Sequence, residues 1–348
     1  YPFEGDIAAG PKAHIEAVSK RWLAPDGDTA RGLDGYRLDV ADQIPMGFWR
    51  DYFRFVKNVK PSAYLVGEIW WRKWPNHLMD PAPYTGEAGI FDAVMFYQIY
   101  KPARSFFGAV TDSITAQQFR DSVTFQWDRL PDATRRAMMN VSATHDTPRL
   151  LTCLDNPGPY KVGASGRDNN AYNTGPPRDD TRRRAALYRL WEYTTIGAPH
   201  IWNGDELGMW GADDPECRKP LWWPDLEGFQ AESPAPGHAG RAAPVAADKA
   251  LNEQYRVLAK LRRENPTLVN GELNFLPSGR DRVLLYERRD AQERIVVALN
   301  TSTRPLTITL PGDGKYRVLH TTGTPARNQN GRRLTLPALS GTALQHRP

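Results

Sequence analysis

Three carboxylates follow strand-like runs of the sequence: Asp39 in LDGYRLDVADQ, Glu68 in AYLVGEIWW and Asp146 in NVSATHDTPRL. Arg37 lies two residues before Asp39, so both side chains point to the same face if this run is a strand. His145 directly precedes Asp146. A nucleophilic carboxylate beside an arginine, a second carboxylic acid and a third carboxylate are the groups that cleave an acetal. The sequence therefore predicts chemistry on a glycosidic bond.

The spacing of the first two carboxylates favours a retaining mechanism. A retaining glycosidase needs its two carboxyl groups about 5–5.5 Å apart, and neighbouring strands lie about 4.8 Å apart. Asp39 and Glu68 would meet this requirement at the ends of adjacent strands. Arg37 would keep Asp39 ionised, and the apolar residues after Glu68 would raise its pKa as an acid catalyst needs. His145 and Asp146 could hydrogen-bond the hydroxyl groups of a sugar ring.

Strand and helix patterns alternate over residues 1–268, as in repeated βαβ units. Predicted strands cover 34–40, 63–70, 90–97, 138–144 and 198–203, and predicted helices cover 11–23, 45–59, 115–129, 180–195 and 248–263. Catalytic groups at the carboxyl ends of successive parallel strands are typical of a (β/α)8 barrel, an α/β fold with its active site in the loops after the strands. From residue 269 on, short alternating runs separated by turn residues predict an antiparallel all-β domain.

Composition excludes several classes of partner. The net charge of +5 comes from scattered arginines, without a basic stripe interleaved with aromatics, so no nucleic-acid partner is expected. The arginines at 182–184 follow two aspartates at a predicted helix start and are interpreted as a solvated helix face. No apolar run reaches 18 residues, so no membrane span is expected. The chain begins at Tyr1, which leaves a cytoplasmic, periplasmic or secreted location open.

Cysteines, tryptophans and turn-rich stretches add less specific information. Cys153 and Cys217 have no metal-ligand spacing and form no disulfide framework, so they are interpreted as structural thiols. Residues 155–180 and 228–247 are rich in turn residues and predict loops, the second of them mobile. Several tryptophans lie beside the motifs, where an indole could stack on a sugar ring or simply pack in the core: Trp70, Trp71, Trp74, Trp202, Trp210, Trp222 and Trp223.

The segments GYRLDVADQ, VGEIW and ATHDTPRL resemble, in this order, three short signature segments of the α-amylase family of glycoside hydrolases. Residues 197–206 resemble the last barrel strand of that family. The segment GADDPECRKPLWW resembles its neopullulanase, cyclomaltodextrinase and maltogenic amylase branch. The resemblance implies a retaining enzyme of starch degradation that acts on α-glucans, maltooligosaccharides or cyclodextrins by double displacement.

The resemblance also implies roles for single residues. Asp39 is implied as the nucleophile, Glu68 as the acid/base and Asp146 as the transition-state stabiliser. The residues implied to bind substrate are Arg37, Trp70, His145, Asp214 and Arg218, with Trp70 on the leaving-group side and the last two on the sugar beyond the cleavage site. No metal ligand is predicted, and no cofactor is implied except that calcium remains open through a preceding N-terminal part.

The resemblance does not include the whole family pattern. The family's first signature, an Asp…Asn-His segment, and a sugar-stacking tyrosine of the second strand are not found in the sequence. We therefore expect about five of eight βα units, from the third helix through the eighth helix in residues 1–268, and a β-sandwich in residues 269–348. We also expect activity to require an N-terminal segment before Tyr1, or a companion chain that carries the first part of the barrel.

Alternative interpretations remain open at this point. G-x-R-x-D could be a structural ion pair, the His-Asp pair a capping or metal-binding element, and Asp214 with Arg218 a salt bridge within a loop. The chain could be a non-catalytic carbohydrate-binding or scaffold relative, although its three carboxylates are intact. A sucrose- or trehalose-directed transglycosylase of the same family is a further alternative.

Overall fold

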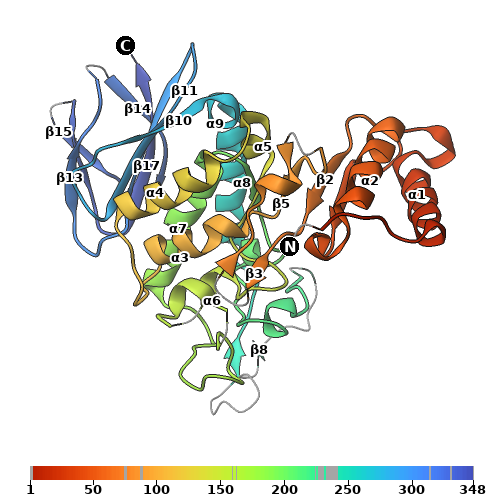
Figure 1. Cartoon of the computed structure of the whole chain (residues 1–348). Helices are drawn as coiled ribbons and strands as arrows, with labels where there is room; N and C mark the ends of the chain where they lie inside the picture. Colours follow the sequence, from red (N-terminus) through yellow and green to blue (C-terminus); the bar gives the residue numbers. More distant parts are fainter. Residues whose placement is uncertain are drawn as a thin grey trace. The chain divides into compact units, whose positions relative to one another are not determined.

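The structure, a computed structural model, describes residues 3–73, 77–86, 89–158, 160–161, 163–223, 225, 231–232, 242–312, 315–329 and 331–347 (Figure 1). Trp74 and most of the predicted loop 228–247 lie outside these residues. The chain forms two compact units. The first unit comprises Tyr1–Gln98 and Phe125–Asn140, and the second comprises Ile99–Thr124 and Val141–Pro348.

The first unit alternates helices with short strands. Its elements are α1 (Ala9–Leu23), β1 (Gly35–Leu38), α2 (Met46–Val59), β2 (Tyr64–Gly67), β3 (Trp71–Lys73), β4 (His77–Leu78), β5 (Ala93–Val94) and α5 (Asp132–Ala137), with single 3-10 turns at Pro25–Gly27, Ala41–Gln43 and Ala82–Tyr84. Helices α1 and α2 lie side by side (Figure 1). The 3-10 turn Tyr97–Ile99 and strand β6 (Met139–Val141) both cross from one unit to the other.

A parallel sheet in the order β1-β2-β5 organises the first unit. Arg37 pairs in register with Val66, and Leu38 with Gly67. The β2 strand is buried along Leu65–Gly67 because its side chains are apolar or absent, and α2 turns a buried stripe of Phe48, Trp49, Tyr52 and Val56 inward. A Cβ on Gly67 would lie 2.6 Å from the Phe91 ring, so this strand end tolerates no side chain without a shift.

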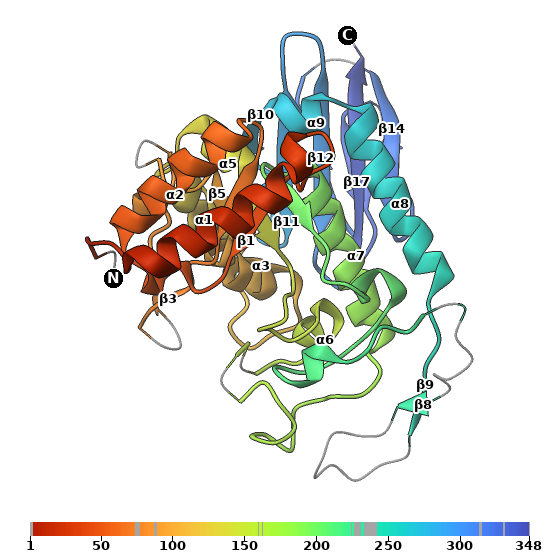
Figure 2. The ribbon, with the colours of Figure 1, turned by 90° about the vertical axis from the view of Figure 1, so that its right-hand side faces the viewer.

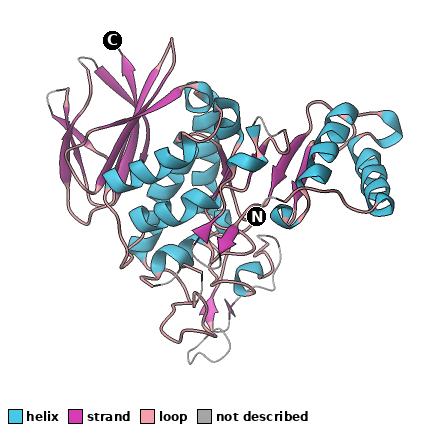
Figure 3. Ribbon diagram, viewed as in Figure 1, coloured by secondary structure: helices cyan, strands magenta, loops and turns pink. Residues whose placement is uncertain are grey.

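The second unit combines helices with two antiparallel sheets (Figure 3). Its helices are α3 (Tyr100–Phe107), α4 (Ala116–Trp127, which ends in the first unit), α6 (Leu150–Asp155), α7 (Asp179–Thr194), α8 (Lys249–Glu264) and α9 (Thr267–Asn270). Its short elements are β7 (Ala198–His200), β8 (Ala231–Glu232), β9 (Ala243–Pro244) and the 3-10 turns Asp205–Leu207 and Glu216–Arg218. The strands of its two C-terminal sheets are β10 (Glu272–Leu276), β11 (Val283–Arg289), β12 (Arg294–Asn300), β13 (Leu306–Thr309), β14 (Lys315–Thr322), β15 (Arg327–Gln329), β16 (Arg333–Leu336) and β17 (Ser340–Arg347).

The C-terminal strands form a five-stranded sheet, β10-β11-β12-β17-β14, and a three-stranded sheet, β13-β16-β15. Apolar residues of both sheets share one buried cluster, which contains Val283, Leu285, Val296, Ala298, Ile308, Leu310, Leu334, Leu336 and Leu344. Helix α7 packs against β12, β14 and β17 (Figure 2). Helix α9 packs against β11 and β12, and both strands are buried over nearly their whole length. These observations confirm the predicted antiparallel C-terminal sheet domain.

The interpretation of residues 182–184 as a solvated helix face is wrong for one arginine. Arg183 is exposed, but Arg184 is only 6% exposed. Its Nη1 donates to the carbonyls of Phe107 and Thr301, each at 3.3 Å, so it joins α7 to the end of α3 and to the residue after β12. A buried guanidinium needs such acceptors because leaving its donors unpaired is costly.

Predicted elements and observed elements differ mainly in length. The predicted strand 90–97 contains only the two-residue β5, after which the chain turns into a 3-10 turn and α3. Helices α3, α5 and α6 were not predicted; α6 is buried at every position, so it has no polar face to mark its period.

Among the described residues, none of the helices has both the length and the apolar character needed to cross a membrane.

Candidate active site

Asp39 and Glu68 extend from neighbouring strand ends in the first unit. Leu38 and Gly67, the residues directly before them, are register partners in the parallel β1–β2 pair. The Glu68 amide donates to the Leu38 carbonyl at 2.9 Å, and the Ala41 amide donates to the Glu68 carbonyl at 3.2 Å. The backbone ladder therefore continues past both strands and fixes the start of each carboxylate side chain.

Arg37 bridges the two carboxylates. Its Nη1 lies 2.5 Å from Asp39 Oδ1, and its Nη2 lies 2.5 Å from Glu68 Oε1. Its Nε is directed at Met95 Sδ, 3.5 Å away. The Asp39 side chain is 69% exposed, whereas that of Glu68 is 9% exposed. One carboxylate is thus open to an incoming molecule, while the other is enclosed, which is the asymmetry expected for a nucleophile and an acid.

Val40 has a backbone conformation that is unusual for its residue type. Its φ of 47° and ψ of 40° are left-handed, a region that β-branched residues rarely adopt. This turn directs the Val40 amide toward Glu68 Oε2, at 3.3 Å. Residues held in such conformations cluster at functional sites, at a cost of about 1–3 kcal/mol each. Val40 was not predicted as a site residue, because nothing in the sequence LDVADQ indicates a positive φ.

Trp70 is packed against other aromatic rings. Its ring stacks on Tyr97 with centroids 4.0 Å apart, and on Trp71 with centroids 4.8 Å apart. Trp70 is 8% exposed. In this structure Trp70 is therefore an aromatic core residue two positions after Glu68, and its role toward a leaving group stays a prediction.

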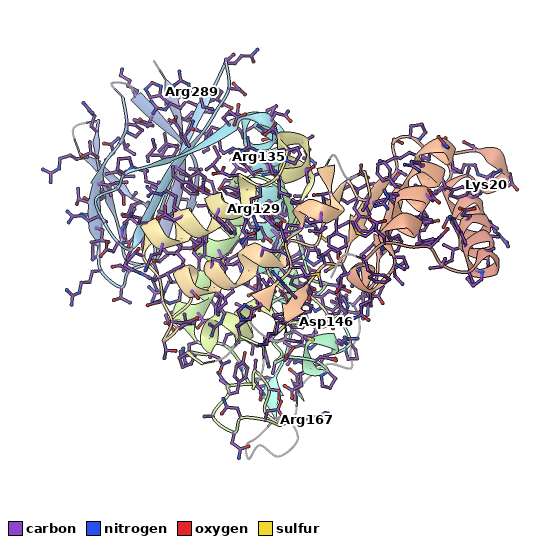
Figure 4. The ribbon with its side chains drawn as sticks, viewed as in Figure 1. Lys20, Arg129, Arg135, Asp146, Arg167 and Arg289 are labelled. Carbon is purple, nitrogen blue, oxygen red and sulfur yellow. The ribbon has the colours of Figure 1, made fainter. Side chains whose placement is uncertain are left out.

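His145 and Asp146 occupy a tight turn in the second unit, and Asp146 is labelled in Figure 4. Arg218 Nη2 lies 2.5 Å from Asp146 Oδ1, and His145 Nε2 lies 3.3 Å from Asp146 Oδ2. Arg218 Nε also lies 2.8 Å from Asp214 Oδ1. Asp214 and Arg218 thus form the loop salt bridge that was one interpretation of their spacing. Arg218 additionally contacts the carboxylate implied to stabilise the transition state.

Several buried polar side chains lie in the same unit, among them Arg149, three residues after Asp146. Arg149, fully buried, lies 2.9 Å from Asp205 Oδ1 and donates to the Asn203 carbonyl at 2.9 Å. Burial raises the pKa of Asp205 to about 6, although the ion pair with Arg149 opposes the shift. Burial also lowers the pKa of His200 to about 4 and raises the pKa of Glu192 to about 8. Asp205 is therefore neutral below about pH 6 and Glu192 below about pH 8, whereas His200 is neutral above about pH 4.

Lys161 and Cys217 are further residues at this turn that sequence reasoning did not connect with it. Lys161 Nζ donates to the Asp146 carbonyl at 2.5 Å, and Cys217 Sγ donates to the His145 carbonyl at 3.1 Å. Burial raises the pKa of the Cys217 thiol to about 12, consistent with the predicted structural thiol. Lys161 lies in the turn-rich stretch 155–180, where composition predicts a loop but not its contacts.

Within either unit, the described part of the chain brings no three His, Cys, Asp or Glu side chains close enough to hold one ion. The expectation about calcium therefore remains untested.

Two protein families match this chain, one over residues 12–271 and the other over residues 273–341. The family described as "Alpha amylase, catalytic domain" matches residues 12–271, and "Maltogenic Amylase, C-terminal domain" matches residues 273–341. A cyclomaltodextrinase of Geobacillus thermopakistaniensis (strain MAS1) is 32% identical over 84% of this chain and 41% of its own length. A maltogenic alpha-amylase of Bacillus acidopullulyticus is 30% identical over 94% of this chain and 47% of its own length.

Solved structures agree with this fold. A structure titled "Cyclomaltodextrinase" covers 98% of this chain and 49% of its own, with a TM-score of 0.72 and 24% identity. The chain belongs to the alpha-amylase family, with an alpha-amylase catalytic domain followed by a C-terminal antiparallel sheet domain. The resemblance noted in the sequence is thereby confirmed. The chain spans somewhat less than half the length of the curated relatives described above.

Proposed function

We propose that this chain carries the catalytic carboxylates of a retaining α-glycosidase that acts on α-glucans, maltooligosaccharides or cyclodextrins. The observation that carries the proposal is the bridge from Arg37 to both Asp39 and Glu68 at neighbouring strand ends. A retaining mechanism needs two carboxyl groups separated by about one strand spacing. An inverting mechanism needs a wider separation, about 6.5–9.5 Å, to admit a water molecule.

In the proposed reaction, Asp39 attacks the anomeric carbon while Glu68 gives its proton to the departing glycosidic oxygen. A covalent glycosyl–Asp39 ester forms and the glycosidic bond breaks. Glu68, now ionised, takes a proton from water, the resulting hydroxide attacks the anomeric carbon, and Asp39 leaves as a carboxylate. The exposure of Asp39 and the enclosure of Glu68 support this assignment of roles.

The remaining residues are assigned from their positions in the motifs. Asp146 is proposed to hydrogen-bond ring hydroxyls as the transition state develops, with His145 beside it. Arg218 supports this role because its Nη2 lies 2.5 Å from Asp146 Oδ1 and can hold this carboxylate in place. Asp214 is proposed to reach the sugar beyond the cleavage site, and Trp70 to line the leaving-group side through its edge.

Finer features of the architecture are also proposed. We assign β1, β2, β5, β6 and β7 to about five of the eight strands of a (β/α)8 barrel, within residues 1–268. We assign residues 269–348 to a β-sandwich. The parallel order β1-β2-β5, and the buried cluster shared by the two C-terminal sheets, support these assignments. Calcium, if the whole protein uses it, is proposed to bind outside the residues discussed above.

The substrate class is tested by incubating the whole protein with cyclodextrin, pullulan, starch and sucrose. We expect release of maltose-type products from the first three, with the α-anomer formed first, as seen by NMR during the initial minutes. Rapid turnover of sucrose alone would favour the sucrose-directed alternative. The first-formed β-anomer would contradict a retaining mechanism.

The Asp39→Asn variant separates an enzyme from a non-catalytic carbohydrate-binding relative. The amide has the size of the carboxylate but is a far poorer nucleophile, so we expect a loss of 10³-fold or more in turnover. Sugar binding measured by calorimetry should persist. A wild-type protein that binds maltooligosaccharides and turns over none of these four substrates would favour the scaffold alternative.

A further inference from the structure

We propose that Lys161 is a positioning residue for Asp146: its ammonium group fixes the backbone carbonyl of Asp146 and so sets where that carboxylate stands during catalysis. The proposal rests on the proposed function, because it concerns the residue assigned to stabilise the transition state. Lys161 lies in the stretch 155–180, far from the three motifs in sequence.

The contact is short and shielded from water. Lys161 Nζ lies 2.5 Å from the Asp146 carbonyl oxygen and 2.7 Å from Asp213 Oδ1. The side chain of Lys161 is 10% exposed and that of Asp213 is 14% exposed. A paired ammonium in such surroundings makes a stronger hydrogen bond than the same contact would make in water.

The turn that carries Asp146 is closed by hydrogen bonds from its amides. The Thr144 amide donates to Thr147 Oγ1 at 2.8 Å, and the Asp146 amide donates to Thr144 Oγ1 at 3.1 Å. These bonds use amides of the turn, and the Thr147 amide in addition donates to the Thr144 carbonyl at 3.4 Å. The Asp146 carbonyl accepts from Lys161, which lies outside the turn. Removal of Lys161 would take a charge-assisted hydrogen bond from this part-buried carbonyl and so allow the turn to move.

The neighbouring carbonyl is held in the same manner from the other loop. Arg218 Nε donates to the His145 carbonyl at 2.8 Å, and Cys217 Sγ donates to it at 3.1 Å. Two consecutive peptide groups are thus held from outside by three side chains. Lys161 contacts the backbone carbonyl of Asp146. Arg218 instead contacts the backbone carbonyl of His145 and the side-chain carboxylate of Asp146.

The loop that carries Lys161 is itself held in place by the loop that carries Asp213. The Asp213 amide donates to the Ala164 carbonyl at 2.9 Å, which ties the loop of Lys161 to the loop that carries Asp213. Ala164, Tyr172 and Ala212 form a small buried cluster beside this contact. Because Asp213 neutralises the charge of Lys161, the effect of Lys161 on Asp146 is mainly one of position.

The main experiment measures kcat and KM of the whole protein on a maltooligosaccharide for Lys161→Met, Lys161→Gln and Lys161→Arg. Misplacement of about 1 Å can cost a factor of about 100 in rate. We expect kcat to fall about 10- to 100-fold in Lys161→Met, with KM changed less than threefold. Lys161→Gln, which is too short to reach both acceptors, should fall similarly, and Lys161→Arg should recover most of the rate.

A double-mutant cycle distinguishes positioning from a merely structural role. If Lys161 acts through Asp146, Lys161→Met should change the residual rate less than twofold in an Asp146→Ala background. Lys57→Met is a matched control, since Lys57 Nζ also joins a backbone carbonyl, that of Ala63, to a carboxylate, that of Asp92. That variant should lose stability but keep its kcat.

The outcomes separate the two proposals. An inactive wild-type protein would refute the proposed function. An active wild type whose Lys161→Met and Lys161→Gln variants are folded, by circular dichroism, and keep kcat within twofold would overturn the role of Lys161 alone. An equal loss of rate with and without the Asp146 carboxylate would also overturn it, because Lys161 would then act on the fold in general.

Discussion

Asp39 and Glu68 stand side by side because the residues before them, Leu38 and Gly67, are register partners of a parallel strand pair. The sheet therefore places the backbone starting points of the two side chains about one strand spacing apart, as the proposed retaining mechanism needs. Arg37, two residues before Asp39, then points to the same face and contacts both carboxylates. A one-residue change of register would break this arrangement completely, because it would turn one carboxylate to the other face.

Arg37→Lys should severely impair catalysis while leaving the charge in place. An arginine offers a planar fork that contacts Asp39 and Glu68 at once, whereas a lysine is a single point charge. We expect kcat/KM to fall at least 100-fold, because one of the two carboxylates loses its partner. Arg50→Lys is the control, since Arg50 pairs with exposed Glu4. A value of kcat/KM in Arg37→Lys close to that of the wild type would contradict the bridging role.

Glu68→Gln should damage turnover in a way that depends on the leaving group. Natural α-glucans need protonation of the glycosidic oxygen, whereas activated aryl glycosides need little. We expect a loss of at least 10³-fold on maltooligosaccharides and a much smaller loss in the first step with an aryl maltoside. Pre-steady-state release of the phenol is the measurement. Equal damage to both substrates would indicate that Glu68 is structural.

Glu192 should make stability depend on pH within the second unit. Burial raises its pKa from an ordinary value of 4.5 to about 8. A raised pKa contributes stability that is fully present below pH 4.5 and is lost as the pH rises through about 8. We expect the wild type to lose stability relative to Glu192→Gln between pH 6.5 and pH 8, by up to a few kcal/mol.

Urea unfolding at several pH values in this window measures the difference. Two other buried groups have pKa values below this pH window: the pKa of Asp205 is about 6 and that of His200 is about 4. The pKa of His200 is lowered, so its contribution is present above pH 6.5 and is lost only as the pH falls. Parallel pH curves for the wild type and Glu192→Gln would contradict a buried, protonated Glu192.

The sequence predicted the elements that carry Asp39 and Glu68 because each follows a run whose apolar residues mark a buried strand. The structure places β1 at Gly35–Leu38 and β2 at Tyr64–Gly67, inside the predicted ranges 34–40 and 63–70. Helix α2 was predicted from an amphipathic stripe, and its inward face is buried. These signals are local, so a single sequence contains them.

Contacts between distant segments left no such signal. Lys161 lies in a stretch where composition predicts only a loop, and its partner Asp213 is about fifty positions away in the sequence. Arg184 was interpreted as solvated because its neighbours are charged, yet its acceptors lie on Phe107 and Thr301. The left-handed backbone of Val40 is likewise imposed by the turn around it, since its residue type disfavours that conformation.

The most direct test of the account is to trap the glycosyl–enzyme ester. The whole protein would be incubated with a 5-fluoro-α-glycosyl fluoride, whose leaving group lets the ester form and whose ring fluorine slows its hydrolysis. Mass spectrometry of the digested protein should then find one sugar on the peptide that contains Asp39, and none in Asp39→Asn. A label on Glu68 or Asp146, or release of product from an active enzyme without any trapped ester, would contradict the assignment of Asp39 as the nucleophile.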